Sequence, residues 1–225
     1  MLILALDAST PVTTVALAET EGRLVLAEIS VPSRGPSGGA SEALLPAVHA
    51  ALDLAGEELG AVDVILCGVG PGTFTGIRIA ASTARALALG TGSPLAKNST
   101  LQALAAPALS CRHALLAVLD ARRGEVFSQR FSVDGPTSGI ACTGPDDLSV
   151  DGGLLVVGDG AVRYRESLER LGYVPPDGSP LHRVSAVGHV MSADLSPVAA
   201  EELVPIYVRE PDAEVRRDLN PWGRS

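Results

Sequence analysis

The sequence predicts an α/β protein made of two tandem α/β units, and three observations lead to that expectation. A strand-rich segment opens the chain, a second one begins after residue 107, and segments with helical periodicity follow each of them. We expect a first unit over residues 1–106, a second over 107–208 and a flexible tail over 209–225, where the sequence is charged and contains proline. The 225 residues are enough for one large core or two smaller ones.

The first unit is expected to begin with short strands, because apolar and β-branched residues alternate with turn signals such as Glu21-Gly22. A loop rich in Pro, Gly and Ser follows over 31–40 and leads into a helix. The expected strands of this unit are 2–6, 13–18, 23–30, 62–69 and a short one near Leu95, followed by a helix from about Thr100.

A leucine-striped helix is expected over 41–59. Its apolar residues recur at helical spacing, and Pro46 fixes the start near Ser41 because proline is tolerated only close to the beginning of a helix. The stripe consists of Leu44, Val48, Leu52, Ala55 and Leu59, and it is widened by Leu45.

The most informative stretch, residues 67–89, joins the buried strand to a helix with unusually small side chains. Gly70-Pro71-Gly72 is expected to form the turn. Thr75 is expected to be the N-cap, because its hydroxyl can accept a hydrogen bond from a free first-turn amide. Small side chains let another helix approach closely, so this is predicted to be a contact helix and not a catalytic one. The small residues are Ala80, Ala81, Ser82, Ala84, Ala86 and Ala88.

The glycine-rich turn does not carry a standard nucleotide-binding motif. A phosphate loop needs a lysine, and no Lys lies between Gly68 and Gly90. The dinucleotide fingerprint fails because Thr73 occupies its third glycine position. A helix N-terminus, with roughly half a positive charge, can still attract an anion. A plain strand-to-helix turn is the favoured interpretation, with an anion site as the alternative.

The second unit is expected to open with a hairpin whose turn is Asp120-Ala-Arg-Arg-Gly124. A loop-like segment over 134–147 separates this hairpin from another buried strand that ends in Gly158-Asp-Gly160. The expected elements are strands 114–119, 125–133, 154–157 and 203–208, and helices 161–171 and 184–192.

Composition excludes some functions. The net charge is −9, from 17 Lys and Arg against 26 Asp and Glu, and only seven aromatic residues are available for stacking on bases. Autonomous RNA binding is therefore not expected, although a partner could supply a positive surface. Cys67, Cys111 and Cys142 are widely spaced, which favours reduced thiols in the cytosol. The apolar start reaches Asp7 too soon for a signal peptide, and no run approaches the roughly 20 apolar residues of a membrane span. We expect a cytoplasmic protein.

Metalloprotease and serine hydrolase motifs are missing from the sequence. His182 and His189 are seven residues apart, no His-Glu-x-x-His sequence exists, and Gly-x-Ser-x-Gly does not occur. Each histidine is therefore interpreted as a lone surface or packed residue: His49, His113, His182 and His189.

Taken together, the motifs resemble the bacterial YeaZ-type (TsaB) family, the dimerisation subunit of the tRNA threonylcarbamoyladenosine machinery. The block from Gly70 to Ile79 is the most specific, and the matches lie in order over nearly the whole chain. The family usually has His where this sequence has Ala40, and the sequence does not say what this replacement does. The matching pieces are Asp7-x-Ser9-Thr10, Ser41-Glu42-x-Leu44-Leu45-Pro46, Gly70-Pro-Gly-Thr-Phe-Thr-Gly-Ile-Arg-Ile79, Ser99-Thr-Leu101, Asp120-Ala-Arg-Arg-Gly-Glu-Val-Phe127, Gly158-Asp-Gly-Ala161 and Tyr207-Val-Arg209.

The resemblance implies a fold of the actin, Hsp70 and sugar-kinase (ribonuclease H-like) type and a non-catalytic role. The chain would pair with a homologous TsaD-type subunit that transfers threonylcarbamoyl from its adenylate to adenosine beside the tRNA anticodon. A small TsaE-type ATPase would join the pair, and tRNA would be met only through the complex. No cofactor is firmly expected, although ATP or ADP at the partner interface is possible, as is a homodimer of the isolated chain.

The resemblance also implies two sets of site residues. The two helices would form half of a four-helix bundle with the partner, and three loops would be the remains of a nucleotide pocket. The alternative for the helices is that both pack on their own sheet, and the alternative for the polar loop residues is that they satisfy turn amides, which we favour. The expected partner-binding residues are Leu44, Leu45, Val48, Leu52, Thr75, Ile77, Arg78, Ala81, Ala84, Arg85 and Ala88, and the pocket residues are Asp7, Ser9, Thr10, Asp120, Gly158, Asp159 and Gly160.

A second function remains open on the same fold: a small-molecule kinase or ATPase with a nucleotide between the two units. Asp7 would be its only good candidate for a general base.

Overall fold

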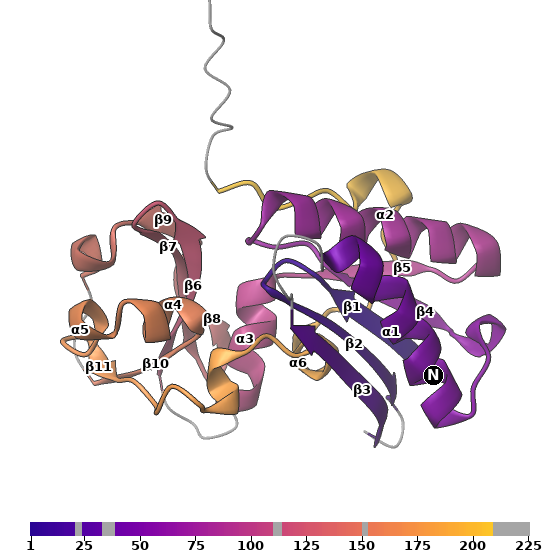
Figure 1. The fold of residues 1–225 in the computed structure, drawn as a ribbon, viewed down its shortest axis with the longest axis horizontal. Coiled ribbons are helices and arrows are strands. Elements are labelled where there is room, and N and C mark those ends of the chain that lie inside the picture. Colours follow the sequence, from indigo (N-terminus) through magenta and orange to yellow (C-terminus); the bar gives the residue numbers. More distant parts are fainter. Residues whose placement is uncertain (21–23, 33–38, 110–113, 150–152, 209–225) are drawn as a thin grey trace, which may run out of the picture.

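The computed structural model describes residues 1–20, 24–32, 39–109, 114–149 and 153–208, and it contains two β-sheets with helices around them (Figure 1). The expected tail over 209–225 and the expected turn at Glu21-Gly22 lie outside the described residues. None of the helices described is long and apolar enough to cross a membrane.

The first sheet has five strands in the order β3-β2-β1-β4-β5. The first three form an antiparallel meander, whereas β1, β4 and β5 are parallel. Strand β1 lies in the middle and is buried along its whole length, which fits a sheet covered on both faces. The bounds are β1 Leu2–Asp7, β2 Val12–Glu19, β3 Leu24–Pro32, β4 Val64–Gly68 and β5 Leu95–Asn98.

Alternate residues of β1 enter different cores. Leu4 and Leu6 pack with α1 (Ala40–Ala55) and α2 (Phe74–Thr91), which cover one face. Ile3 and Ala5 pack on the other face against α6 (Ala186–Ser192). This two-residue alternation places α1 and α2 together on one side of the sheet and α6 on the opposite side.

The second sheet has six strands in the order β11-β10-β6-β7-β8, and β9 also pairs with β7. Helices α4 and α5 cover one face, while α3 (Thr100–Leu109) covers the other. The bounds are β6 Leu115–Arg122, β7 Glu125–Ser132, β8 Gly135–Pro136, β9 Ala141–Thr143, β10 Leu154–Val157, β11 Gly172–Tyr173, α4 Asp159–Arg163 and α5 Arg165–Leu168. Short 3-10 turns lie at Leu59–Ala61, Pro145–Asp147, Pro180–His182 and Ala200–Glu202.

Helix α3 lies between the two sheets and packs against α6 as well as β6 (Figure 1). The expected boundary at 106/107 falls inside this helix. The chain then returns to the first sheet: α6 packs on β1, and Val198 forms a bridge with Leu95. The C-terminal part of the described chain therefore belongs spatially to the first unit.

Several sequence-based details are corrected by the structure. The expected helix over 41–59 ends at Ala55, because Gly56 adopts a left-handed conformation that terminates it. Thr73, not Thr75, is the N-cap of α2, and its side chain makes no capping hydrogen bond. The expected helix over 161–171 is divided at Tyr164 into α4 and α5. Residues 203–208 form no strand, although Ile206 donates a backbone hydrogen bond to Val69.

Candidate functional site

The carboxylate of Asp7, at the end of β1, is fully buried and held by three groups of the chain itself. The amide of Ser9 donates to Oδ1 at 2.5 Å. The Thr100 hydroxyl and His189 Nε2 both approach Oδ2, at 2.9 and 2.7 Å. A carboxylate enclosed in this way has no open side from which a phosphate or a metal ion could approach.

Donor directions within this cluster follow from the chemistry of its members. Thr100 gives its single proton to Asp7, so the Ser9 hydroxyl donates to Thr100 Oγ1 across 2.9 Å. His189 carries its proton on Nε2, because the facing carboxylate can only accept. Burial alone would raise the pKa of Asp7, but the hydrogen bonds from His189 and from the Ser9 amide hold it below its usual value.

The glycine-rich segment 68–76 lies directly on the first hairpin. A Cβ atom at Gly68 would overlap the Asp7 carboxylate, and one at Gly76 would overlap the Ala8 carbonyl oxygen. The amide of Thr73 donates to the Ser9 carbonyl oxygen at 2.6 Å. These glycines therefore serve close packing of the chain on itself.

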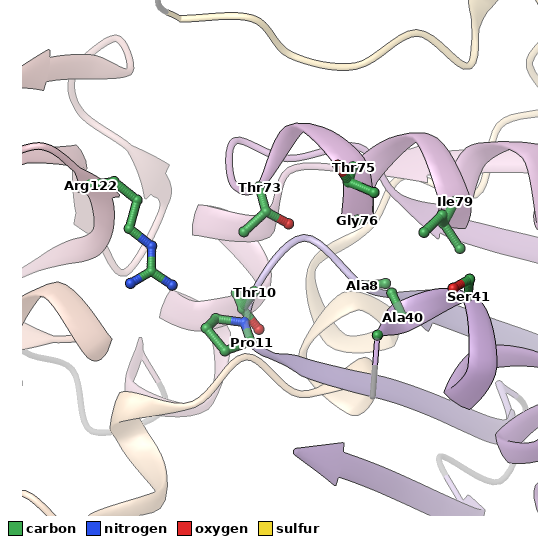
Figure 2. Close-up of a pocket in the computed structure, with 11 residues that line it drawn as sticks. Ala8, Thr10, Pro11, Ala40, Ser41, Thr73, Thr75, Gly76, Ile79 and Arg122 are labelled. Atoms are coloured by element: carbon green, nitrogen blue, oxygen red, sulfur yellow. The ribbon is translucent and has the colours of Figure 1, made fainter. Parts of the chain in front are cut away.

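A cavity of about 290 Å³ opens beside this packed segment. Figure 2 shows Thr10 and Pro11 of the first hairpin below it, Thr73 and Thr75 from the start of α2 above it, and Arg122 reaching toward it from the second unit. Hydroxyls, a helix N-terminus and a guanidinium are groups that suit an anion. Its remaining lining comes from the start of α1 and nearby residues: Ala8, Gly39, Ala40, Ser41, Gly76 and Ile79.

The second hairpin carries its own acidic residue, Asp120, in a different setting. Arg122 and Arg163 lie 3.3 and 3.6 Å from its Oδ2 and are themselves more than half exposed. The Asp120 amide donates to Asp159 at 3.0 Å. Burial raises the pKa of Asp159. The hydrogen bond from the Asp120 amide lowers this pKa, and the negative charge of the Asp120 side chain raises it further.

The Gly158-Asp159-Gly160 turn is packed against strand β6. A Cβ atom at Gly158 would overlap the Val118 carbonyl oxygen, and one at Gly160 would come within 2.9 Å of Leu119. The buried His182 ring contacts the backbone of Gly158. The seven expected pocket residues thus fall into two separate clusters, one around Asp7 and one around Asp120 and Asp159.

The expected partner-binding residues also divide into two groups. Six are buried in the chain's own core and offer no surface for a partner: Leu44, Val48, Leu52, Ile77, Ala81 and Ala84. Of the others, Leu45, Thr75 and Arg78 are exposed, whereas Arg85 and Ala88 are half-buried. The burial of these six residues is explained by the alternative stated above, in which both helices pack on their own sheet.

Two arginines of α2 bind the C-terminal segment of the same chain. Arg85 donates to the carbonyl oxygens of Ala200 and Leu203 at 2.8 and 2.9 Å. Arg78 lies 3.6 Å from the centre of the Phe74 ring and donates to the Tyr207 hydroxyl at 3.2 Å. These contacts hold residues 200–207 along α2.

Sequence reasoning missed two residues of the Asp7 cluster. Thr100 was matched only as part of a short motif, and His189 was expected to be a lone packed histidine. They lie 93 and 182 residues from Asp7 in the chain, so no local spacing could connect them. Among the described residues, no group of three His, Cys, Asp or Glu side chains could hold a metal ion.

The chain is similar to proteins of a known family. Residues 37–149 match the family described as TsaD, tRNA N6-adenosine threonylcarbamoyltransferase. The Escherichia coli tRNA threonylcarbamoyladenosine biosynthesis protein TsaB is 30% identical over 75% of this chain and 80% of its own length. An uncharacterized Mycobacterium tuberculosis protein is 32% identical over 94% of this chain and 93% of its own length. The structure of YeaZ from Pseudomonas aeruginosa superposes with a TM-score of 0.74 at 29% identity, covering 92% of this chain and 99% of that one.

These similarities confirm the expected α/β fold class and the resemblance to the YeaZ-type (TsaB) family that was stated from the motifs.

Proposed function

Because this chain belongs to the TsaB family, we propose that it takes part in the biosynthesis of threonylcarbamoyladenosine in tRNA as a non-catalytic, activating subunit. It would act by pairing with a TsaD-type homologue that carries out the transfer. The observation that carries this proposal is the enclosure of Asp7, the best candidate for a general base, by Ser9, Thr100 and His189. A general base must reach the proton that it removes, and this carboxylate is 0% exposed.

The outer surfaces of α1 and α2 support pairing as the mode of action. Leu45 and Leu54 on α1, and Phe74 and Leu89 on α2, are large apolar side chains between 48% and 89% exposed. Such residues on neighbouring helices are typical of a protein interface. We propose the side of α1 that carries Leu45, with Thr75 and Arg78 of α2, as the contact for the homologous subunit, or for a second copy when the chain is isolated. A TsaE-type ATPase as third member, and ATP or ADP at the interface, remain predictions.

The experiment is a transfer assay with the catalytic homologue, the small ATPase and tRNA, run with and without this chain. Leu45→Asp is expected to weaken the complex about thirtyfold, as loss of an interface anchor does, and to reduce the transfer rate in proportion. Met191→Asp is the matched control, because Met191 is 56% exposed on α6, on the opposite face of the sheet. The interface assignment fails if Leu45→Asp binds the homologue as well as Met191→Asp does.

The kinase or ATPase alternative is tested separately by calorimetry of the isolated chain with ATP and magnesium. Tight binding, together with turnover that disappears in a folded Asp7→Asn variant, would replace the proposed role by an enzymatic one.

A further inference from the structure

A second cavity, of about 470 Å³, lies where strands β4 and β5 end, away from the hairpins discussed above. The strands are parallel neighbours. Helix α2, which follows β4, covers one face of the sheet, whereas α3, which follows β5, packs on α6 at the opposite face. Such a switch in direction creates a crevice at the carboxyl ends of the strands, where α/β proteins commonly bind ligands.

Ser99 supplies the first specific feature of this cavity. It is the residue before α3, and its carbonyl oxygen accepts from the Ala103 amide at 3.0 Å, as an N-cap residue does. An N-cap serine normally uses its hydroxyl to bind a first-turn amide. Here the hydroxyl is buried, the residue is only 9% exposed, and no described residue bonds it. The first-turn amides of Leu101 and Gln102, which have no acceptor inside the helix, remain as donors beside it.

The charged residues that line the cavity indicate which kind of ligand it can bind. Lys97 donates one of its three N–H groups to the Glu202 carbonyl oxygen and keeps two for other acceptors. Asp194 lines the same cavity, and its Oδ1 is occupied by the amide and hydroxyl of Ser196. A cation, a helix N-terminus and a hydroxyl favour an anion, whereas the single carboxylate disfavours one with two negative charges.

The apolar part of the wall comes mainly from the C-terminal segment, whereas Asn98, Gln102 and Ser192 add polar side chains. Val204, Pro205 and Ile206 line the cavity, and the Ile206 amide holds this segment to Val69. From these features we infer that the cavity binds a small organic carboxylate with a single negative group and an apolar body. The carboxylate would accept from Ser99, Lys97 and the start of α3, and the apolar body would lie on residues 204–206. The inference is independent of the proposed subunit role.

The test is an NMR titration of the isolated full chain with three probes: butyrate, L-2-aminobutyrate and inorganic phosphate. We expect either carboxylate to shift the Leu101 and Gln102 amides, and phosphate to bind at least tenfold more weakly because of Asp194. Binding of both carboxylates would mean that the acid group alone is recognised. Preference for the amino acid would mean that Asp194 pairs with its ammonium group. Both results support the site.

Variants identify the binding groups. Ser99→Ala and Lys97→Gln should each weaken carboxylate binding roughly tenfold, the effect of losing a hydrogen bond to a charged group. Ser167→Ala, in α5 of the second unit, is the matched control and should bind like the original chain. Lys97 is exposed, so its replacement leaves folding intact even if Ser99→Ala does not. Unshifted amides, equal binding of phosphate, or unchanged binding by Lys97→Gln would overturn the assignment.

Discussion

The two hairpins that open the two units carry an aspartate at comparable places but use it in different ways. Asp7 in the first unit is bound by groups from the β1–β2 turn, α3 and α6 and is closed to solvent. Asp120 in the second unit is covered by Arg122 and Arg163, whose side chains are 59% and 55% exposed. The first aspartate is part of a rigid core, whereas the second is screened by side chains that can move away.

The difference between the two aspartates lies in what encloses each of them. In the first unit, the glycine-rich segment and α6 close over the Asp7 carboxylate at the end of β1. In the second unit the turn remains open, and Arg122 faces the cavity beside the first hairpin (Figure 2). The comparison teaches that Asp7 is bound inside the fold, whereas Asp120 lies beside arginines that reach solvent.

The largest effect is expected from Gly76→Ala. The added methyl group would overlap the Ala8 carbonyl oxygen, a backbone atom that cannot move without shifting the hairpin. We expect the free energy of unfolding to fall by about 3 kcal/mol, at the upper end for overpacking. Gly90→Ala, in the last turn of the same helix, has open space and should stabilise the protein by about 0.5 kcal/mol. Denaturant unfolding measures both, and equal stability of the two variants would refute close packing at Gly76.

Replacing the two hairpin aspartates should have unequal consequences. Asp7→Asn leaves buried donors on His189 and Thr100 facing an amide, and we expect a loss of about 2 kcal/mol in unfolding free energy. Asp120→Asn gives up ion pairs with two exposed arginines and should cost only about 0.5 kcal/mol. Chemical denaturation curves of the two variants provide the comparison, and a smaller loss for Asp7→Asn would contradict it.

The smallest expected effect is the dependence of stability on pH. Ionisation of Asp7 stabilises the fold, whereas ionisation of Asp159 destabilises it. The folded pKa of Asp7 is lowered, so its stabilisation is present above the usual value of 3.8 and is lost as the pH falls through the folded pKa. The folded pKa of Asp159 is raised by burial, so its ionisation costs stability above that pKa, and the penalty is absent below 3.8.

Asp159→Asn should therefore stabilise the protein by about 0.5 kcal/mol at neutral pH, and its advantage should shrink as the pH falls toward 3.8. Melting temperatures recorded as a function of pH, for this variant beside Asp7→Asn, check both signs. A variant at position 159 that is less stable than the original chain at neutral pH would show that the ionised carboxylate is stabilising.

Periodicity and turn residues are local signals, and they were sufficient for most strands and helices and for the family. They predicted a strand over 203–208 that does not form, and they missed the short strands β8, β9 and β11. The sequence did not predict that the 186–206 segment returns to the first sheet, since that depends on contacts with β1 and β5. The sequence also could not predict the hydrogen-bond partners of Asp7, because Thr100 and His189 become its neighbours only when the chain folds. Helical spacing predicted the stripe at Leu44 and Val48 but not whether it faces a partner or the chain's own sheet.

The most direct test of the structural role of Asp7 is the transfer rate of a complex reconstituted with the Asp7→Asn chain, measured below the melting temperature of that variant. We predict a less stable chain whose complex still works at a rate within about twofold of the original, because the carboxylate touches no substrate. The opposite result, an Asp7→Asn chain as stable as the original in a complex that is about a hundredfold slower, would show that Asp7 acts in the chemistry.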